Sequence, residues 1–358
     1  CTASEIPSFS WRAICAADKA RRRRCSMSTS RRRNAVSGVE GRQEGVGISD
    51  AVHYVPRVNE MRFPDLRAFI SQLRRDGDNA EIDAAVDSRF EAAEIHRRVI
   101  AAGGPALFFT CVEGSDFPLA TNLFGTARRA EMAFGHRPAQ LVRRAVEFVQ
   151  RSFPPDLGSL WSARDLVAAG LRLGMKSTRS GPVREVETRD VDLGRLPVIT
   201  SWPEDGGPFL TLPLVYTEDP DGAGHNLGMY RMQVHDERTT GMHWQIGKGG
   251  GFHHARASAK DEALPVTVFL GGPPALILAA VAPLPENVPE LVLASLLAGR
   301  RISQCAGPGP HSLLANAEFA LSGVVPPAVR LPEGPFGDHY GYYSLRHDYP
   351  VFQVEHLS

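Results

Sequence analysis

The sequence contains no pair of cysteines at metal-ligand or redox spacing. Its five cysteines lie far apart, at positions 1, 15, 25, 111 and 305. Disulfide-stapled domains and zinc fingers place their cysteines at short, recurring spacings, so this pattern excludes both classes of protein. Scattered cysteines are typical of proteins of a reducing compartment, and we expect the protein to be cytoplasmic.

Excess charge and long apolar runs are also absent. The 40 Lys and Arg residues balance the 40 Asp and Glu residues, so the net charge gives no reason to expect nucleic acid or an acidic lipid surface as a partner. The apolar run Leu291–Ala298 is too short to span a bilayer. With 43% hydrophobic and 22% charged residues in 358, the chain has an ordinary globular composition and room for two domains.

Residues 1–60 differ from the rest of the chain. They contain Arg21–Arg24 and Arg31–Arg33 among serines, with few large apolar residues and no periodicity. Such a segment is read as a basic arm for nucleic acid, as an Arg-rich transit peptide, as a disordered tail, or as upstream DNA translated in frame, because methionines follow at Met27 and Met61. We predict a disordered basic tail or non-native leader and assign it no function.

Helices and strands alternate in residues 61–175, which predicts an N-terminal α/β domain. Pro64-Asp65 opens a helix whose apolar residues follow a helical spacing, as Asp does at a helix N-cap. The other expected elements are helices at Glu91–Ala102 and Pro138–Arg151, and strands at Ala106–Phe109 and Pro118–Phe124.

Residues 176–358 are predicted to be mostly β-structure, because short apolar runs alternate with Gly, Pro and Asp turns. One helix is expected at Glu290–Leu297. A barrel or sandwich follows from strands at Val183–Thr188, Leu196–Thr200, Phe209–Tyr216, Pro265–Leu270, Glu318–Val324 and Val351–Val354.

The densest group of polar residues is the segment Asn226–Gly251. Its first part, Leu227–Val234, has the pattern of a strand buried on both faces; residues 236–241 read as a turn, and Met242–Ile246 as the returning strand. Arg231 lies in the first strand and cannot lose its charge. A carboxylate or a phosphate is therefore expected beside it.

Three further groups offer chemistry, each with a plainer alternative. Glu290 begins an apolar helix, where a carboxylate stabilises the helix dipole without another role. Glu333 and Asp338 flank a Gly-Pro-Phe-Gly turn, so they either share a pocket or lie in a solvated turn. The run Gly247–Gly251 suits a phosphate or a flexible loop. Histidines 243, 253 and 254 match no standard metal-ligand spacing.

Taken together, these residues resemble the UbiD family of reversible decarboxylases. Its three signatures resemble Asn226–Arg231, the proline-rich stretch ending at Glu290, and Glu333–Asp338. The resemblance spans Met61–Leu357, and the further matching segments are Arg62–Arg67, Gly103–Ala106, Asn122–Thr126, Trp202–Asp205 and Gly337–Tyr343.

The resemblance implies a prenylated FMN cofactor and metal ions. Asn226 and Glu290 match the ligands of Mn²⁺ or Mg²⁺ that bridges the protein to the cofactor phosphate, with K⁺ beside it, as hard oxygen ligands suit such ions. A third ligand would fall at Gly247, so water or a nearby histidine would replace it. The implied cofactor-binding residues are Asn226, Met229, Tyr230, Arg231, His243, Trp244, Gln245, Lys248 and Gly249.

Arg231, Glu333 and Asp338 resemble the catalytic network of the family. The resemblance implies that Arg231 keeps one carboxylate ionised and that Asp338 donates and accepts the proton. The cofactor accepts the electron pair left by carbon dioxide.

The implied fold class is α+β, with an N-terminal α/β domain at 61–175 followed by a split β-barrel flavin-binding domain at 176–358. A C-terminal α/β domain that helps members oligomerise is expected to be missing from this sequence. The full-length form is expected to be a homo-oligomer, supplied with cofactor by a flavin prenyltransferase.

The expected reaction is non-oxidative decarboxylation of a hydroxyaromatic or α,β-unsaturated acid. The acid is either a polyprenyl-hydroxybenzoate in ubiquinone or menaquinone biosynthesis, which would allow peripheral membrane association, or a phenolic acid. Two alternatives remain: a non-catalytic, truncated flavin-binding fragment, and a split-barrel flavin reductase. The reductase requires a nicotinamide site, for which the sequence gives no support.

Overall fold

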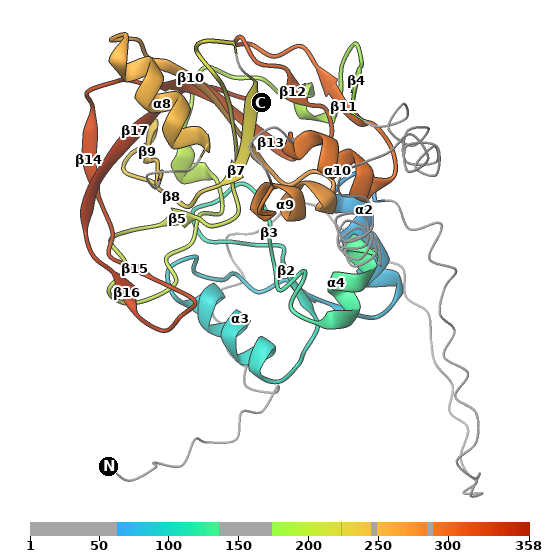
Figure 1. Ribbon diagram of the computed structural model, residues 1–358. Helices are drawn as coiled ribbons and strands as arrows, with labels where there is room; N and C mark the ends of the chain where they lie inside the picture. The colour runs from blue at the N-terminus through green and yellow to red at the C-terminus, as the bar shows by residue number, and fades with distance from the viewer. Residues whose placement is uncertain (1–62, 136–173, 223, 245–248, 285–288) are drawn as a thin grey trace, which may run out of the picture. The chain divides into compact units, whose positions relative to one another are not determined.

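The computed structural model describes residues 63–135, 174–222, 224–244, 249–284 and 289–358 (Figure 1). The chain divides into two compact units, 1–57 and 58–358, and every described element belongs to the second unit. The expected tail at 1–60 and helix at 138–151 lie outside the described residues.

The first described elements form a three-stranded sheet with helices. They are α2 (Leu66–Arg75), β1 (Asn79–Ile82), α3 (Glu91–Ala101), β2 (Ala106–Phe109), β3 (Leu119–Thr121) and α4 (Ala127–Phe134). Strand β2 is central, parallel to β1 and antiparallel to β3. The predicted α2, α3 and β2 are confirmed, and Asp65 caps α2 by accepting a hydrogen bond of 2.7 Å from the Ala68 N–H. Strand β3 is shorter than predicted because Asn122 adopts a positive φ of 56°.

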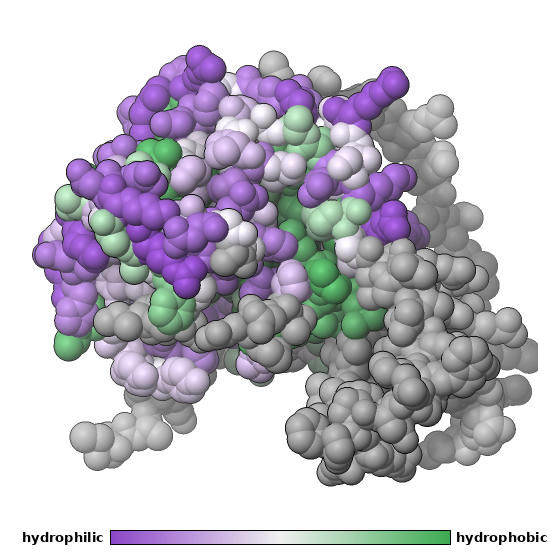
Figure 2. Space-filling model, turned by 45° about the horizontal axis from the view of Figure 1, so that its top comes forward, coloured by the Kyte–Doolittle hydropathy of each residue, from purple (hydrophilic) through white to green (hydrophobic). Residues whose placement is uncertain are grey.

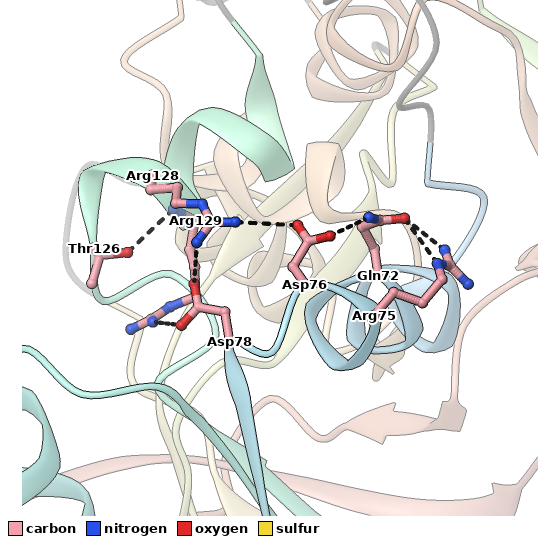
Figure 3. Close-up of polar contacts among 7 residues, drawn as sticks. All are labelled: Gln72, Arg75, Asp76, Asp78, Thr126, Arg128 and Arg129. Carbon is pink, nitrogen blue, oxygen red and sulfur yellow. Dashed lines mark hydrogen bonds and ion pairs between the residues drawn. The ribbon is translucent and has the colours of Figure 1, made fainter. Parts of the chain in front are cut away.

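Buried polar contacts join α4 to this sheet (Figure 3). Arg129 is 1% exposed; its guanidinium donates to Asp78 at 2.8 Å and to the Gly104 carbonyl at 3.2 Å. Its neighbour Arg128 contacts Asp76 at the end of α2. A fully buried arginine needs such partners, so these contacts fix α4 against β1.

A seven-stranded antiparallel sheet dominates the rest of the described chain. Its strand order is β14 (Arg330–Glu333), β17 (His347–Leu357), β13 (Phe319–Val325), β10 (Leu264–Leu270), β6 (Leu214–Glu218) and β7 (His225–Met229), with β9 (Thr239–Gly241) pairing with β17. Figure 1 shows β14 and β17 curving strongly. The architecture is thus a mixed α/β fold whose curled sheet forms half a barrel.

Smaller elements surround this sheet. The two-stranded pairs are β5 (Phe209–Leu210) with β8 (Met232–Gln233), and β15 (Phe336–Gly337) with β16 (Tyr343–Ser344). A three-stranded sheet contains β12 (Leu313–Leu314), β11 (Ile302–Cys305) and β4 (Met175–Ser177). The helices are α8 (Gly249–Ala259), α9 (Pro274–Val281) and α10 (Glu290–Ala298), with short 3₁₀ turns η2 (Pro182–Arg184) and η3 (Leu193–Arg195).

The large sheet buries both of its faces, and alternate residues serve different cores. On β10, Val266 and Val268 join the core that includes Ala257 of α8. Phe269, the next residue along the strand, joins the core formed with α9 and α10. Helices α9 and α10 lie side by side in Figure 1 and contact each other. This period-two alternation is what a strand buried on both sides requires.

The predicted hairpin at 226–251 is wrong in its register. The first strand divides into β7 and β8 at Tyr230-Arg231, and these pair with β6 and β5. The turn is tighter than expected because the Asp236 carboxylate accepts hydrogen bonds from the N–H groups of residues 238 and 239. The returning strand is therefore β9, not Met242–Ile246, and it pairs with β17.

Other strand predictions need correction. The expected strand Val183–Thr188 begins as the 3₁₀ turn η2, with Pro182 at its first position. Residues 196–200 contribute only isolated bridges at 199 and 200. The expected Phe209–Tyr216 is two strands, β5 and β6, because residues 211–213, which include Pro213, interrupt the ladder. The predicted β10, α10, β13 and β17 are confirmed, and α8 and α9 were not predicted.

The surface carries no membrane signature in its described part. None of the described helices is both long and apolar enough to cross a bilayer. The face shown in Figure 2 is mostly hydrophilic, with hydrophobic areas beside undescribed residues. Scattered exposed apolar side chains are normal in globular proteins, so these areas are assigned no function.

Candidate active site

The most buried charge among the described residues of the large sheet is Glu333, the last residue of β14. Its side chain is fully buried, and its Oε1 lies 3.1 Å from Nε of Arg231, between β7 and β8. The prediction that Arg231 requires an anionic partner is confirmed by this ion pair. Arg231 also donates to Ser344 Oγ at 3.0 Å and lies over the Phe336 ring at 4.5 Å.

A histidine supports the same carboxylate oxygen. His243 Nδ1 lies 2.8 Å from Glu333 Oε1, and the His243 ring packs against Tyr349, with centroids 4.4 Å apart. Burial, and then the charge of Glu333, raise the pKa of Tyr349. Arg231 and His243 therefore hold one oxygen of a buried carboxylate, which stays charged in such a place only with donors of this kind.

The turn after Glu333 is fixed by β8. Gln233 accepts a hydrogen bond of 2.7 Å from the Gly334 N–H and donates one of 2.8 Å to the Gly206 carbonyl. The Gly206 N–H donates to the Pro335 carbonyl at 2.7 Å. A single amide side chain thus joins the turn to loop 201–207, and this loop to β8.

Loop 201–207 also holds the next residues of the turn. Asp205 accepts a hydrogen bond of 2.8 Å from the Gly337 N–H, and its other oxygen accepts from the N–H groups of residues 201 and 202. The Trp202 ring occupies the space beside Gly337, where an added Cβ would lie 2.1 Å from it. Arg97 of α3 stacks on Trp202 at 4.0 Å. These contacts connect α3 to the turn that bears the acids.

The structure does not bring Asp338 to the Arg231–Glu333 pair. Asp338 follows β15, and its side chain is 25% exposed. Its described partners are His339, whose Nδ1 lies 2.7 Å away, and the Tyr340 N–H at 3.1 Å. Its role as proton donor stays a prediction.

Asn226 and Glu290 lie together, as a shared metal ligation requires. The Leu227 N–H, next to Asn226, donates to Glu290 Oε2 at 3.2 Å. A Cβ on Gly249, the first residue of α8, would lie only 2.1 Å from Asn226 Oδ1. Two oxygen donors beside a helix N-terminus fit a hard divalent ion and an anionic phosphate. The described residues contain no cluster of three His, Cys, Asp or Glu suited to a metal.

The other residues expected at the cofactor do not share one face. Tyr230 packs with the core of α8, and its hydroxyl lies 3.5 Å from Nδ2 of Asn226; burial raises its pKa. Met229 packs on the opposite face, against α9 and α10. Trp244 is buried, and its Nε1 has no described partner. Gln245 and Lys248 lie outside the described residues.

Five histidines have their pKa lowered, in each case chiefly by burial: His96, His235, His253, His254 and His311. We call these the buried histidines. His253 Nδ1 lies 2.9 Å from Thr217 Oγ1, so it has a structural partner.

Sequence reasoning missed several residues that hold the site. Gln233 lies two positions after Arg231, and its polar side chain within an apolar strand was the available signal. Asp205 lay in a segment matched to the family but was assigned no role. His235 and Ser344 gave no signal, because only the fold brings them to Glu333 and Arg231.

Comparison with known proteins identifies both parts of the chain. Residues 175–358, just over half of it, match the family model described as the 3-octaprenyl-4-hydroxybenzoate carboxy-lyase Rift-related domain. Residues 70–149 match the N-terminal domain of the same carboxy-lyase. A 4-hydroxybenzoate decarboxylase polypeptide from Chlamydia pneumoniae is 50% identical over 293 residues, which cover 82% of this chain and 50% of that protein. The chain spans about half the length of such curated relatives.

Solved structures of the class share the fold. The UbiD-class enzyme HmfF from Pelotomaculum thermopropionicum, in complex with FMN, has a TM-score of 0.68 and 25% identity, covering 82% of this chain and 62% of that one. Its evolved dimeric form, in complex with prFMN, has a TM-score of 0.66 and 25% identity, covering 82% and 65%. The 3,4-dihydroxybenzoic acid decarboxylase of Enterobacter cloacae has 0.68 and 25%, covering 83% and 63%. The chain therefore belongs to the UbiD family of decarboxylases.

Proposed function

We propose that this chain is a prenylated-FMN-dependent carboxy-lyase that removes carbon dioxide from an aromatic carboxylic acid. The observation that carries the proposal is the buried Arg231–Glu333–His243 cluster. An arginine with a fixed hydrogen-bonding fork suits a substrate carboxylate, and it is already oriented by Glu333 and Ser344. The named decarboxylases to which the chain is similar act on hydroxybenzoic acids, which supports a phenolic acid as substrate.

The residues divide the work between binding and proton transfer. Arg231 holds the substrate carboxylate near the buried cluster, where water is largely excluded. Asp338 donates the proton that replaces carbon dioxide on the substrate carbon, because it is partly exposed and can exchange its proton with solvent. Since Asp338 does not contact Arg231 in this structure, the turn 334–338 must move to bring the two residues to one substrate.

Asn226 and Glu290 would hold a divalent metal, Mn²⁺ or Mg²⁺, against the cofactor phosphate at the N-terminus of α8, with K⁺ beside it. The adjacency of these two residues to each other and to Gly249 supports this assignment. The cofactor, when bound, supplies the acceptor for the electron pair that carbon dioxide leaves behind. We further propose the domain division at about residue 175, which agrees with the ranges of the two family models.

Asp338→Asn tests the division of roles. The full chain would be loaded anaerobically with prenylated FMN, Mn²⁺ and K⁺, and carbon dioxide release from 4-hydroxybenzoate and 3,4-dihydroxybenzoate would be measured. We expect Asp338→Asn to abolish turnover while the protein keeps its flavin. Unchanged carbon dioxide release by this variant would refute the role of Asp338. Flavin retention by the unmodified chain without turnover on any acid would favour the non-catalytic flavin-binding alternative.

A further inference from the structure

Glu333 has one satisfied and one unsatisfied oxygen. Arg231 and His243 both contact Oε1, at 3.1 Å and 2.8 Å. The second oxygen, Oε2, is also buried and has no hydrogen-bond partner among the described residues. A buried carboxylate oxygen without a donor is unfavourable, so something beyond these two residues must interact with it.

A second unsatisfied atom faces the same place. His235 Nε2 is buried and also has no described partner. A Cβ on Gly241 of β9 would lie 3.1 Å from Glu333 Oε2 and 3.3 Å from His235 Nε2. The two atoms are thus separated by no more than the sum of these distances, a gap that one water molecule with two hydrogen bonds can bridge. Gly241 has no left-handed backbone, so glycine serves here to leave this space.

The protonation of His235 suits a donor. Burial lowers its pKa, and the charges of Glu333 and Asp236 only partly oppose this, so the imidazole is neutral near neutral pH. A neutral imidazole has one N–H, which its Nε2 can offer toward the hollow. The other titratable groups around the carboxylate are Arg231, His243 and Tyr349.

We propose that His235 is a positioning residue for Glu333, acting through one buried water molecule in the hollow over Gly241. The water accepts from His235 Nε2–H and donates to Glu333 Oε2. Glu333 is then held from both oxygens, which fixes the orientation in which Oε1 faces Arg231. No proton is transferred in this arrangement. Its catalytic consequence rests on the proposed function, whereas the hydrogen-bonded bridge itself does not.

The first experiment needs no activity. The pKa of His235 would be measured by NMR in the full chain labelled with ¹³C-histidine, with His235→Gln used to assign its signal. Glu333→Gln removes the charge, so the His235 pKa should fall further; an unchanged pKa would overturn the coupling. A high-resolution crystal structure should show one water within about 3.2 Å of both atoms. An empty hollow would overturn the bridge.

The second experiment measures turnover. His235→Phe removes the donor, and Gly241→Ala fills the hollow; each should lower kcat about tenfold with KM unchanged, as expected for the loss of a hydrogen bond to a charged group. The double variant should be no worse than the more severe single one, because both remove the same bridge. His235→Gln, whose amide replaces Nε2, should restore most of the activity. Gly309→Ala is the control, since a Cβ there meets no atom within 4 Å.

Additive losses in the double variant, or no rescue by His235→Gln, would overturn the positioning role. If the unmodified chain releases no carbon dioxide although the NMR coupling and the water are found, the proposed function fails and the bridge stands.

Discussion

Replacing Arg231 by Met should destabilise the protein, because it leaves the Glu333 carboxylate buried and poorly paired. Glu333 is 1% exposed, so its charge cannot be rehydrated without opening the sheet. Removal of one partner from a buried ion pair costs about 3–5 kcal/mol. His243 remains at 2.8 Å as a second donor, which places the expected loss near the lower end, at about 3 kcal/mol. In a chain of this size that corresponds to a fall in Tm of roughly 6–12 °C.

The assay is thermal and urea unfolding of the cofactor-free chain at pH 8 and pH 5. The loss should be smaller at pH 5, since protonation of the carboxyl group removes the unpaired charge. Arg231→Met combined with Glu333→Gln should recover more than half of the lost stability. Arg98→Met, at an exposed helical ion pair, is the matched control and should change Tm by no more than about 2 °C. An Arg231→Met protein as stable as the unmodified chain at pH 8 would show that the buried carboxylate does not depend on this arginine.

Three further predictions concern other parts of the structure. Arg129→Met leaves Asp78 unpaired against α4 and should lower the free energy of unfolding by about 3 kcal/mol, measured in urea; a change below about 1 kcal/mol would contradict the role of the pair. Gly337→Ala forces a Cβ into the Trp202 ring, so kcat should fall at least about tenfold, with Gly309→Ala as control; an unchanged kcat would show that the turn adapts freely. The buried histidines have lowered pKa values, so their contribution to stability is present above about pH 6.5 and is lost as pH falls through their folded-state pKa values. Tm should therefore decline from about pH 7.5 to about pH 5.5, and a flat profile would contradict this.

The local signals in the sequence predicted elements well where one local pattern decided them. Helix α2 follows from Asp65 and an apolar spacing, and β2 from a short apolar run before which Gly and Pro end α3. The need of Arg231 for an anion followed from its fixed charge within a buried strand, and Glu333 satisfies it. These predictions depend on single residues and their immediate neighbours, which is why they could be made without the fold.

Long-range pairing could not be predicted in the same way. The strand expected at 227–234 divides because β5 and β6 offer separate partners to its two halves, a choice that no local pattern encodes. Helix α8 begins in a glycine run that suggested a flexible loop, and its glycines are needed because Asn226 and Trp244 occupy the positions of their missing side chains. His235 reaches Glu333 only through the pairing of β9 with β17.

The proposed activity is tested most simply by measuring carbon dioxide release by the full chain, loaded anaerobically with prenylated FMN, Mn²⁺ and K⁺, together with its visible spectrum and native mass. We predict a bound flavin, a bound metal, and release of carbon dioxide from 4-hydroxybenzoate or 3,4-dihydroxybenzoate that disappears in Arg231→Met. A loaded protein that retains flavin and metal but releases no carbon dioxide from any hydroxybenzoate, or one whose turnover survives Arg231→Met, would contradict the proposed role of the Arg231–Glu333–His243 cluster.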